Sequence, residues 1–260
     1  MQKTQKIMAV TCYYAGRHGN CIFHAGQLIA YAKKHNLPYW IPTEAVAYRH
    51  FRNGDVTVPF VIPSTGTKPI NPTVYNEPDH VHGNPSFHEI PKMDNTIFLG
   101  YYQSFRYFDW CREYILKTFG FSYKMEEGVV SVSVRRGDCL GNKNFPLAPP
   151  EYYHNAIETM QEFGYNRFRV DSDDRAWVRE EFTSKEYHGA EFVFSEFEDP
   201  LYSWLAIQNC EHNIIARSTW SLTAAWFNQN PDKIVLVPTL RHTWWKGVNL
   251  DILSGTKFTQ

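Results

Sequence analysis

Three absences narrow the classes to which this 260-residue sequence can belong. No run approaches the roughly 20 apolar residues that span a bilayer, and the N-terminus has no secretory pattern. The five cysteines are odd in number and form no CxxC pair, which argues against a disulfide framework or a cysteine zinc site. Lys plus Arg number 26 against 27 Asp plus Glu, so no net field favours nucleic acid. We expect a cytoplasmic chain that binds no nucleic acid and has no transmembrane segment, which leaves room for peripheral membrane contact.

Three nucleotide and hydrolase signatures are also missing. The sequence has no GxxxxGK[ST], which argues against a Walker-type ATPase. Its first glycine loop reads Gly16-x-x-Gly19 and not GxGxxG, which argues against a nicotinamide enzyme. A GxSxG nucleophile elbow is absent too.

The composition is that of a globular protein with one or two domains. Apolar residues make up 43% of the chain and aromatic residues 16%. Most of these rings are expected to fill the core, and some suit stacking on bases or sugar faces.

The first half of the chain predicts a βαβ unit followed by a long loop. Residues 7–14 form an apolar run, a glycine loop follows, and residues 21–34 have helical spacing before a short apolar run at 37–41. Residues 49–95 are rich in proline and show no period, so we interpret them as a long loop. A strand at 96–100 and a helix at 107–119 complete this half.

The second half alternates more regularly. The pattern predicts five strands and four helices: strands at 129–134, 168–170, 191–194, 213–216 and 233–237, and helices at 150–163, 176–182, 199–210 and 218–228. Such alternation is typical of a parallel sheet covered on both faces. A polar stretch near 120–127 predicts a boundary between an N-terminal domain, 1–122, and a C-terminal domain, 123–260.

Polar side chains cluster where the predicted strands end. The four clusters are Arg17 with Asn20; Arg135, Arg136 and Asp138; Asp171, Asp173 and Asp174; and Ser218 with Thr219. Ligands of open parallel sheets bind beyond the carboxyl ends of the strands. The clusters therefore predict a ligand site.

The chemistry of these residues suits a diphosphate. Arg135 and Arg136 can each make charge-assisted bonds to phosphate, although an ion pair with Asp138 is the competing role and we expect one arginine for each. Ser218 and Thr219 open a helix whose free N–H groups attract phosphate, and Ser218 can also cap it.

Three roles stay open for the aspartates. Asp173 can accept two hydrogen bonds from guanine or cap the helix that follows. Asp171-Ser172-Asp173 is also a DxD sequence, which in a metal-dependent transferase holds a cation on the diphosphate.

Several segments together resemble a known family. They are Gly16-Arg17-His18-Gly19-Asn20, Gly100–Phe108, Ser133–Asp138, Pro150–Tyr153, Ser172–Asp174 with Trp177, and Asp199 to Ser221. In order and spacing they resemble glycosyltransferase family 11, the bacterial α-1,2-fucosyltransferases. Where the family pattern has His, Phe and Asn, this chain has Ser133, Asp171 and Arg217, and Cys21 replaces a Gln.

The resemblance implies a GT-B-like α/β fold of two Rossmann-like domains whose parallel sheets face a central cleft. It implies an enzyme that moves fucose from GDP-fucose to a glycan hydroxyl with inversion, with no cofactor and no metal. Its partners would be the nucleotide sugar and a glycan acceptor, galactose 2-OH-like by the same resemblance. From length and position alone, we hypothesise that the segment from Pro59 to Pro91, within the 49–95 loop of the N-terminal domain, selects the acceptor.

The resemblance also implies roles for single residues. Arg135 would bind the β-phosphate, and Asp173 would hydrogen-bond the guanine base. Ser218 and Thr219 would contact the diphosphate. The remaining implied donor contacts are Arg17, Asn20, Ser133 and Arg136. Asp138 is the candidate base. A metal-dependent transferase and a nucleotide- or glycan-binding chain without turnover are the alternative readings.

Overall fold

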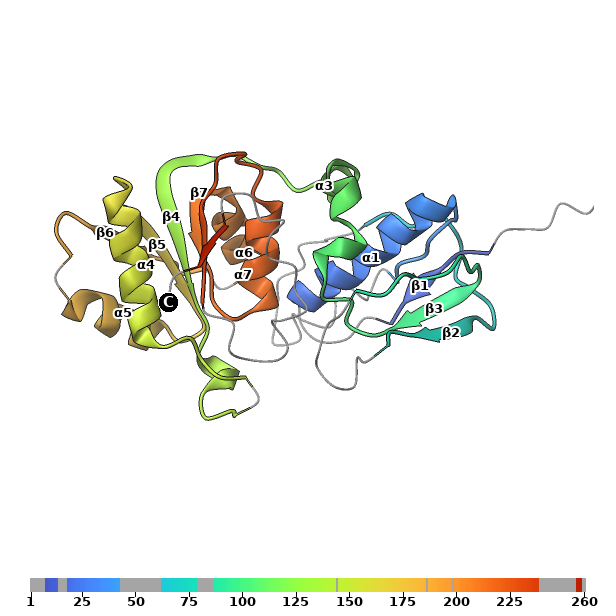
Figure 1. Cartoon of the computed structure of the whole chain (residues 1–260), viewed down its shortest axis with the longest axis horizontal. Helices are drawn as coiled ribbons and strands as arrows, with labels where there is room; N and C mark the ends of the chain where they lie inside the picture. Colours follow the sequence, from blue (N-terminus) through green and yellow to red (C-terminus); the bar gives the residue numbers. More distant parts are fainter. Residues whose placement is uncertain are drawn as a thin grey trace, which may run out of the picture. The chain divides into compact units, whose positions relative to one another are not determined.

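The computed structural model describes residues 8–13, 18–42, 62–78, 87–143, 145–185, 187–197, 199–238 and the backbone of 256–258. These residues form two compact units, one up to Phe121 and one from Ser122 onward. Each unit holds a parallel sheet with helices (Figure 1). The α/β class predicted from the sequence is confirmed. Arg17 and parts of the 49–95 segment lie outside the described residues.

The first unit contains a small parallel sheet in the order β1-β3-β2. Its strands are β1 (Thr11–Cys12), β2 (Thr73–Asn76) and β3 (Thr96–Leu99). The predicted strand at 37–41 is reduced to a single bridge between Val10 and Tyr39. The interpretation of 49–95 as loop throughout was wrong at β2, because Thr73–Asn76 pairs with β3 at the sheet edge and is too exposed to show a period.

Helix α1 (His18–His35) is the main helix of this unit, and almost all of its first four turns are buried. It begins three residues earlier than its apolar spacing predicts. The predicted helix at 107–119 is instead three short pieces: η2 (Phe105–Tyr107), η3 (Asp109–Cys111) and α3 (Arg112–Phe119). Helix α3 ends at Gly120, whose φ of 67° suits a glycine.

The second unit is built on a larger sheet of six parallel strands in the order β6-β5-β4-β7-β8-β9. Their bounds are β4 Glu126–Val134, β5 Arg167–Ser172, β6 Glu191–Phe194, β7 Cys210–Ile214, β8 Val235–Val237 and β9 Thr256–Phe258. The five predicted strands are all present. The expectation that 233–237 is the last strand was wrong, because β9 pairs with β8 at the edge.

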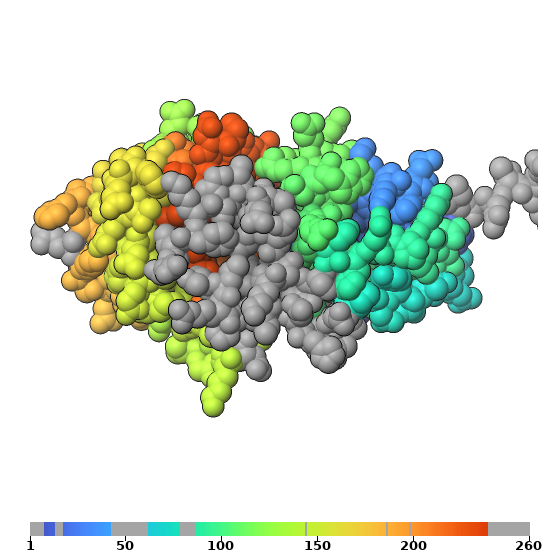
Figure 2. Space-filling model, in the orientation of Figure 1, coloured from blue at the N-terminus to red at the C-terminus, as the bar shows by residue number. Residues whose placement is uncertain are grey.

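Helices cover both faces of this sheet. They are α4 (Pro150–Glu162), α5 (Arg175–Ser184), α6 (Pro200–Asn209) and α7 (Thr219–Phe227). Figure 1 shows α4 and α5 on one face and α6 and α7 on the other. Side chains of alternate β4 positions, Val130, Val132 and Val134, pack in a core with α4 and α5. The segment from η4 (Gly137–Cys139) to α4 protrudes from the surface in Figure 2.

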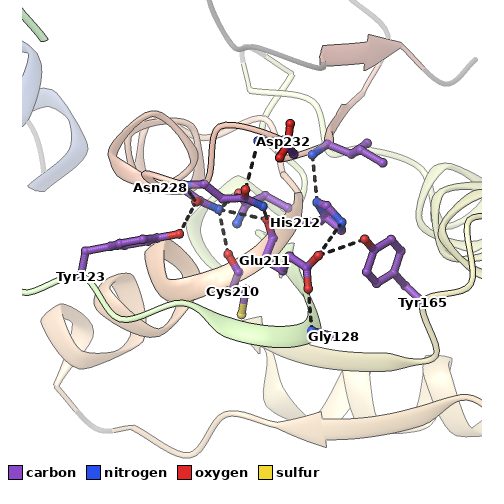
Figure 3. A network of polar contacts seen from close by, with 11 residues as sticks. Tyr123, Gly128, Tyr165, Cys210, Glu211, His212, Asn228 and Asp232 are labelled. Atoms are coloured by element: carbon purple, nitrogen blue, oxygen red, sulfur yellow. Dashed lines mark hydrogen bonds and ion pairs between the residues drawn. The ribbon is translucent and has the colours of Figure 1, made fainter.

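A network of polar contacts, with Asn228 buried at its centre, joins the amino ends of strands of the larger sheet (Figure 3). Asn228, with no exposed surface, donates to the Cys210 carbonyl at 2.8 Å and accepts from the Tyr123 hydroxyl at 3.0 Å. Glu211 accepts from the Gly128 N–H at 2.6 Å and from Tyr165 at 3.0 Å. We call these residues and His212 the amino-end network.

The described residues contain no helix of the length and apolarity that a membrane span requires. All five cysteines are buried free thiols.

Candidate functional site

The strand order of the larger sheet reverses between β4 and β7, so the connections that follow these two neighbouring strands run to opposite sides. From β4 the chain runs outward through β5 and β6, returns to β7 on the other side of β4, and continues to β8 and β9. Loops after β4 and β7 therefore leave the sheet in opposite directions, which opens a crevice for ligands at the carboxyl edge. Three of the four polar clusters follow β4, β5 and β7, and thus lie at this edge.

Arg135 and Asp138 form an ion pair directly after β4. The Arg135 Nη2 atom lies 2.6 Å from Asp138 Oδ1, and the two side chains are 25% and 46% exposed. The Arg135 Nε donates to the thiol sulfur of Cys139 at 3.0 Å. The 3-10 turn at Gly137–Cys139 brings these side chains together. Arg135 is thus the arginine that makes the competing ion pair predicted with Asp138.

Arg136 is held against the start of α5 instead. Its Nε lies 3.0 Å from Asp174 Oδ2, and its guanidinium carbon lies 4.1 Å from the centre of the Trp177 ring. The hydrogen bond from Arg136, together with the Trp177 N–H, lowers the pKa of Asp174. Asp174 and not Asp173 is the N-cap of α5, so the capping role considered for Asp173 was wrong.

Asp173 binds the loop that follows β4. Its Oδ1 accepts the backbone N–H of Arg136 at 2.7 Å. A Cβ at Gly137 would lie 2.6 Å from Asp173 Oδ2, so only glycine leaves room for this carboxylate. Asp173 follows β5 and therefore connects the loop after β5 to the loop after β4. The loop after β4 is also the one that carries Arg135 and Arg136.

The start of α7 contributes the third part of the site. Ser218 is its N-cap, and the Ser218 side chain accepts the Trp220 N–H, which confirms the predicted capping. The first N–H groups of a helix have no intrahelical partner and carry a partial positive charge. Arg217 precedes the cap and reaches the Pro146 and Leu147 carbonyls at 3.5 and 3.4 Å.

Ser133 and Asp171 lie on the α6 face of the larger sheet. They are direct partners in the parallel register of β4 and β5. Asp171 accepts a hydrogen bond from Ser203 of α6. Burial raises the pKa of Asp171, and the Ser203 bond partly offsets this. Ser133 is 3% exposed, and its Oγ makes no hydrogen bond within the described part of the chain.

In the first unit, the structure describes Asn20 but not Arg17. Asn20 lies in the first turn of α1, where its Oδ1 accepts from Gln103 Nε2 at 2.8 Å. This bond connects the two segments of the first unit that carry the family resemblance, one around Asn20 and the other around Gln103.

Sequence reasoning missed Glu77, which shapes the second of these motifs. Glu77 is 3% exposed, and its Oε2 accepts the N–H groups of Tyr101 and Tyr102 at 2.7 and 2.8 Å. Tyr102 has a φ of 50°, and a Cβ at Gly100 would lie 2.4 Å from Glu77 Cβ. Glu77 follows a four-residue exposed strand in a segment without a period, so no sequence signal marks it.

The first unit also has a hollow of about 110 Å³ beside α1. Its lining includes aromatic rings, among them Trp110 at 54% exposure, and cations such as Lys34 and Arg106. The Arg106 guanidinium lies 4.5 Å from the centre of the Phe87 ring. Aromatic faces next to charged hydrogen-bond donors suit a sugar ring.

Among the residues that the structure describes, no three His, Cys, Asp or Glu side chains form a group that could hold a metal ion. The two carboxylates of the DxD sequence have separate partners, Ser203 for Asp171 and the Arg136 N–H for Asp173.

Comparison with known proteins identifies the family. Residues 86–244 match glycosyl transferase family 11, and the chain belongs to that family. The O-antigen biosynthesis glycosyltransferase WbnK of Escherichia coli is 34% identical over 126 residues, which cover 46% of this chain and 40% of WbnK. An alpha-1,2-colitosyltransferase of Escherichia coli is 29% identical over 167 residues, 55% of this chain and 54% of that protein. The chain thus spans about half the length of these relatives or less.

Among solved structures, the chain is similar to POFUT1 in complex with GDP-fucose. The identity is 11% and the TM-score 0.46, and the match covers 93% of this chain and 100% of that one. A POFUT1 structure with GDP aligns over 56% of each chain at a TM-score of 0.33.

Proposed function

We propose that this chain is an inverting, metal-independent glycosyltransferase that moves fucose from GDP-fucose to a hydroxyl of a glycan acceptor. The observation that carries the proposal is the meeting of Arg135, Arg136, Asp173 and the α7 start at the divergence point of the larger sheet in a family 11 chain. The names of the two relatives, an O-antigen glycosyltransferase and an alpha-1,2-colitosyltransferase, support the class and make colitose the second donor sugar to test.

The proposed reaction is a direct displacement. The acceptor oxygen forms a bond to the anomeric carbon while the bond from that carbon to the β-phosphate oxygen breaks, and GDP leaves with both electrons of that bond. Arg135 and the α7 N-terminus at Ser218 and Thr219 stabilise the charge that grows on the leaving phosphate. Arg135 can change partner from Asp138 to phosphate, since this pair is open to solvent.

Asp138 is the proposed acceptor of the hydroxyl proton. Asp138 lies in the same turn as Arg135 and its side chain is 46% exposed, so an acceptor hydroxyl can take the place of Arg135 when that guanidinium binds phosphate. An Asp138→Asn variant should keep GDP affinity within about threefold and lose most of kcat, because the amide cannot accept the proton.

We place acceptor choice in the first unit, in the 49–95 segment and the hollow beside α1. Asn20, which bonds Gln103, and Arg17 are the proposed contacts from this unit to the donor. Replacing the segment from Pro59 to Pro91 should change the preferred acceptor and leave GDP affinity intact. A large loss of GDP affinity in that variant would contradict the assignment.

The first experiment is a thermal-shift screen of the purified chain against GDP, UDP and ADP and their sugars, with and without EDTA. A ligand at 100 times its Kd should stabilise the fold by about 2.7 kcal/mol. We expect a GDP-selective shift that EDTA does not change. A UDP- or metal-dependent shift would favour the DxD reading. GDP binding without transfer or hydrolysis of any donor sugar would favour a binding chain without turnover.

A further inference from the structure

Two polar side chains lie directly opposite each other in the larger sheet. They are Ser133 of β4 and Asp171 of β5. The two residues are register partners on the adjacent parallel strands β4 and β5. Partners in a parallel pair point to the same face of the sheet, so the two side chains lie at one shared site.

The α6 side of the sheet gives this pair its surroundings. Val132 and Val134, the neighbours of Ser133 along β4, pack on the opposite face with α4 and α5. Ser203, in the first turns of α6, donates to Asp171 and fixes the orientation of the carboxylate. The partner of Asp171 therefore comes from α6. The Ser133 Oγ, for which the described residues supply no hydrogen-bond partner, belongs to the register partner of Asp171.

The hydrogen-bonding capacity of the pair is not exhausted. A carboxylate accepts about four hydrogen bonds, and one of those at Asp171 comes from Ser203. A buried hydroxyl without a partner is unfavourable, and within the part of the chain that the structure describes the Ser133 Oγ is such a group. A ligand that offers O–H donors and an oxygen acceptor would satisfy both residues.

We propose that Ser133 and Asp171 bind the vicinal ribose hydroxyls of the nucleotide donor, an inference that rests on the proposed function. An acidic side chain at the end of a strand next to the phosphate-binding loop is placed as in dinucleotide-binding sheets, where it accepts the ribose 2′-hydroxyl. Phosphate is unsuited to this position because its charge has the same sign as Asp171. The diphosphate then lies toward Arg135 and α7, and the ribose toward β5.

The test compares the binding of GDP, 2′-deoxy-GDP and 3′-deoxy-GDP by isothermal titration calorimetry. Wild-type protein should bind GDP at least tenfold more tightly than one of the deoxy nucleotides, since a hydrogen bond to a charged group is lost. Asp171→Asn should weaken GDP and reduce this ratio toward one, and Ser133→Ala should reduce it partially. Asp232→Asn, in the same unit at the amino end of β8, is the matched control and should keep the wild-type ratio.

The outcomes separate the two proposals. A wild-type ratio near one with tight GDP binding would overturn the ribose inference and leave the proposed function standing. Absence of GDP binding by the wild type would overturn the proposed function, and the inference with it. The ratio of GDP to deoxy-GDP affinity is measured on the wild-type protein, so this part of the test does not depend on the folding of any variant. Ser133→Ala removes only the Oγ atom from a buried position.

Discussion

The two ends of the second unit's sheet hold their polar side chains in different ways. At the amino end, Asn228 is completely buried and bonds mainly to backbone and neutral groups. At the carboxyl end, Arg135 and Arg136 are 25% and 19% exposed and pair with carboxylates. Ion pairs open to water contribute at most about 1 kcal/mol each, whereas a buried polar group that loses its partner costs about 1–3 kcal/mol.

This difference separates stability from binding within one sheet. Asn228 has no reason to exchange partners, because an exchange would leave a buried donor or acceptor unsatisfied. Arg135 and Arg136 at the carboxyl end can exchange a carboxylate for a phosphate with little loss. Four changes test the comparison.

The largest effect is expected at Asn228. Asn228→Ala leaves the Cys210 carbonyl, the Tyr123 hydroxyl and the Asn230 N–H without their bonds to this side chain, so the free energy of unfolding should fall by about 3 kcal/mol. Urea denaturation measures it. The surface variant Asn155→Ala on α4 is the control and should change stability by less than about 0.5 kcal/mol. A loss at Asn228 below 1 kcal/mol would mean that the amino-end network does not hold this unit together.

The next effect is on binding. Arg135→Ala should raise the Kd for GDP by about 10- to 100-fold, the loss of one charge-assisted bond, and lower the unfolding free energy by no more than about 1 kcal/mol. Titration calorimetry and urea denaturation measure the two quantities. Arg167→Ala, an exposed arginine at the amino end of β5 that pairs with Glu191, is the matched control for charge. Equal Kd changes in both variants would refute a specific role for Arg135.

A smaller effect is expected from Arg136→Lys. Lysine keeps the charge but loses the planar guanidinium that lies over Trp177 and bonds Asp174. Thermal melts should show a loss of about 0.5–1 kcal/mol. The double variant Arg136→Lys with Trp177→Phe should lose less than the sum of the single variants, and strict additivity would show that the stacking contributes nothing.

The smallest effect is a pH dependence at the amino end. Burial lowers the pKa of His212 below 6.5, and its Nδ1 accepts the Ile234 N–H, which requires a neutral ring. The unfolded chain therefore binds the proton more readily, and stability should be complete above pH 6.5 and fall as the pH is lowered through it. Melting temperatures between pH 8 and 5 should fall more steeply for wild type than for His212→Asn. If the melting temperatures of the two proteins fell equally with pH, a group other than His212 would be responsible for the pH dependence.

Most strands and helices of the second unit could be predicted from the sequence, because the spacing of their apolar residues is clear. The predicted strand at 191–194 is β6 itself, and Pro149 and Pro150 mark the start of α4. Capping was harder to assign among adjacent aspartates, since Asp173 and Asp174 have the same side chain and both bond Arg136, and only Asp174 also accepts the Trp177 N–H. In the first unit, Glu77 acts through backbone N–H groups distant in sequence, and no local pattern reports such a contact.

The stacking of Arg136 on Trp177 has an optical consequence. The indole lies 4.1 Å from a guanidinium whose loop also holds Arg135, so a change of charge at this edge of the sheet alters the field on the ring. Indole emission responds to such fields, and Trp177 is one of 8 tryptophans in the chain. The difference spectrum between wild type and Trp177→Phe would therefore report donor arrival in real time, without label or coupled enzyme, and would give the association rate directly.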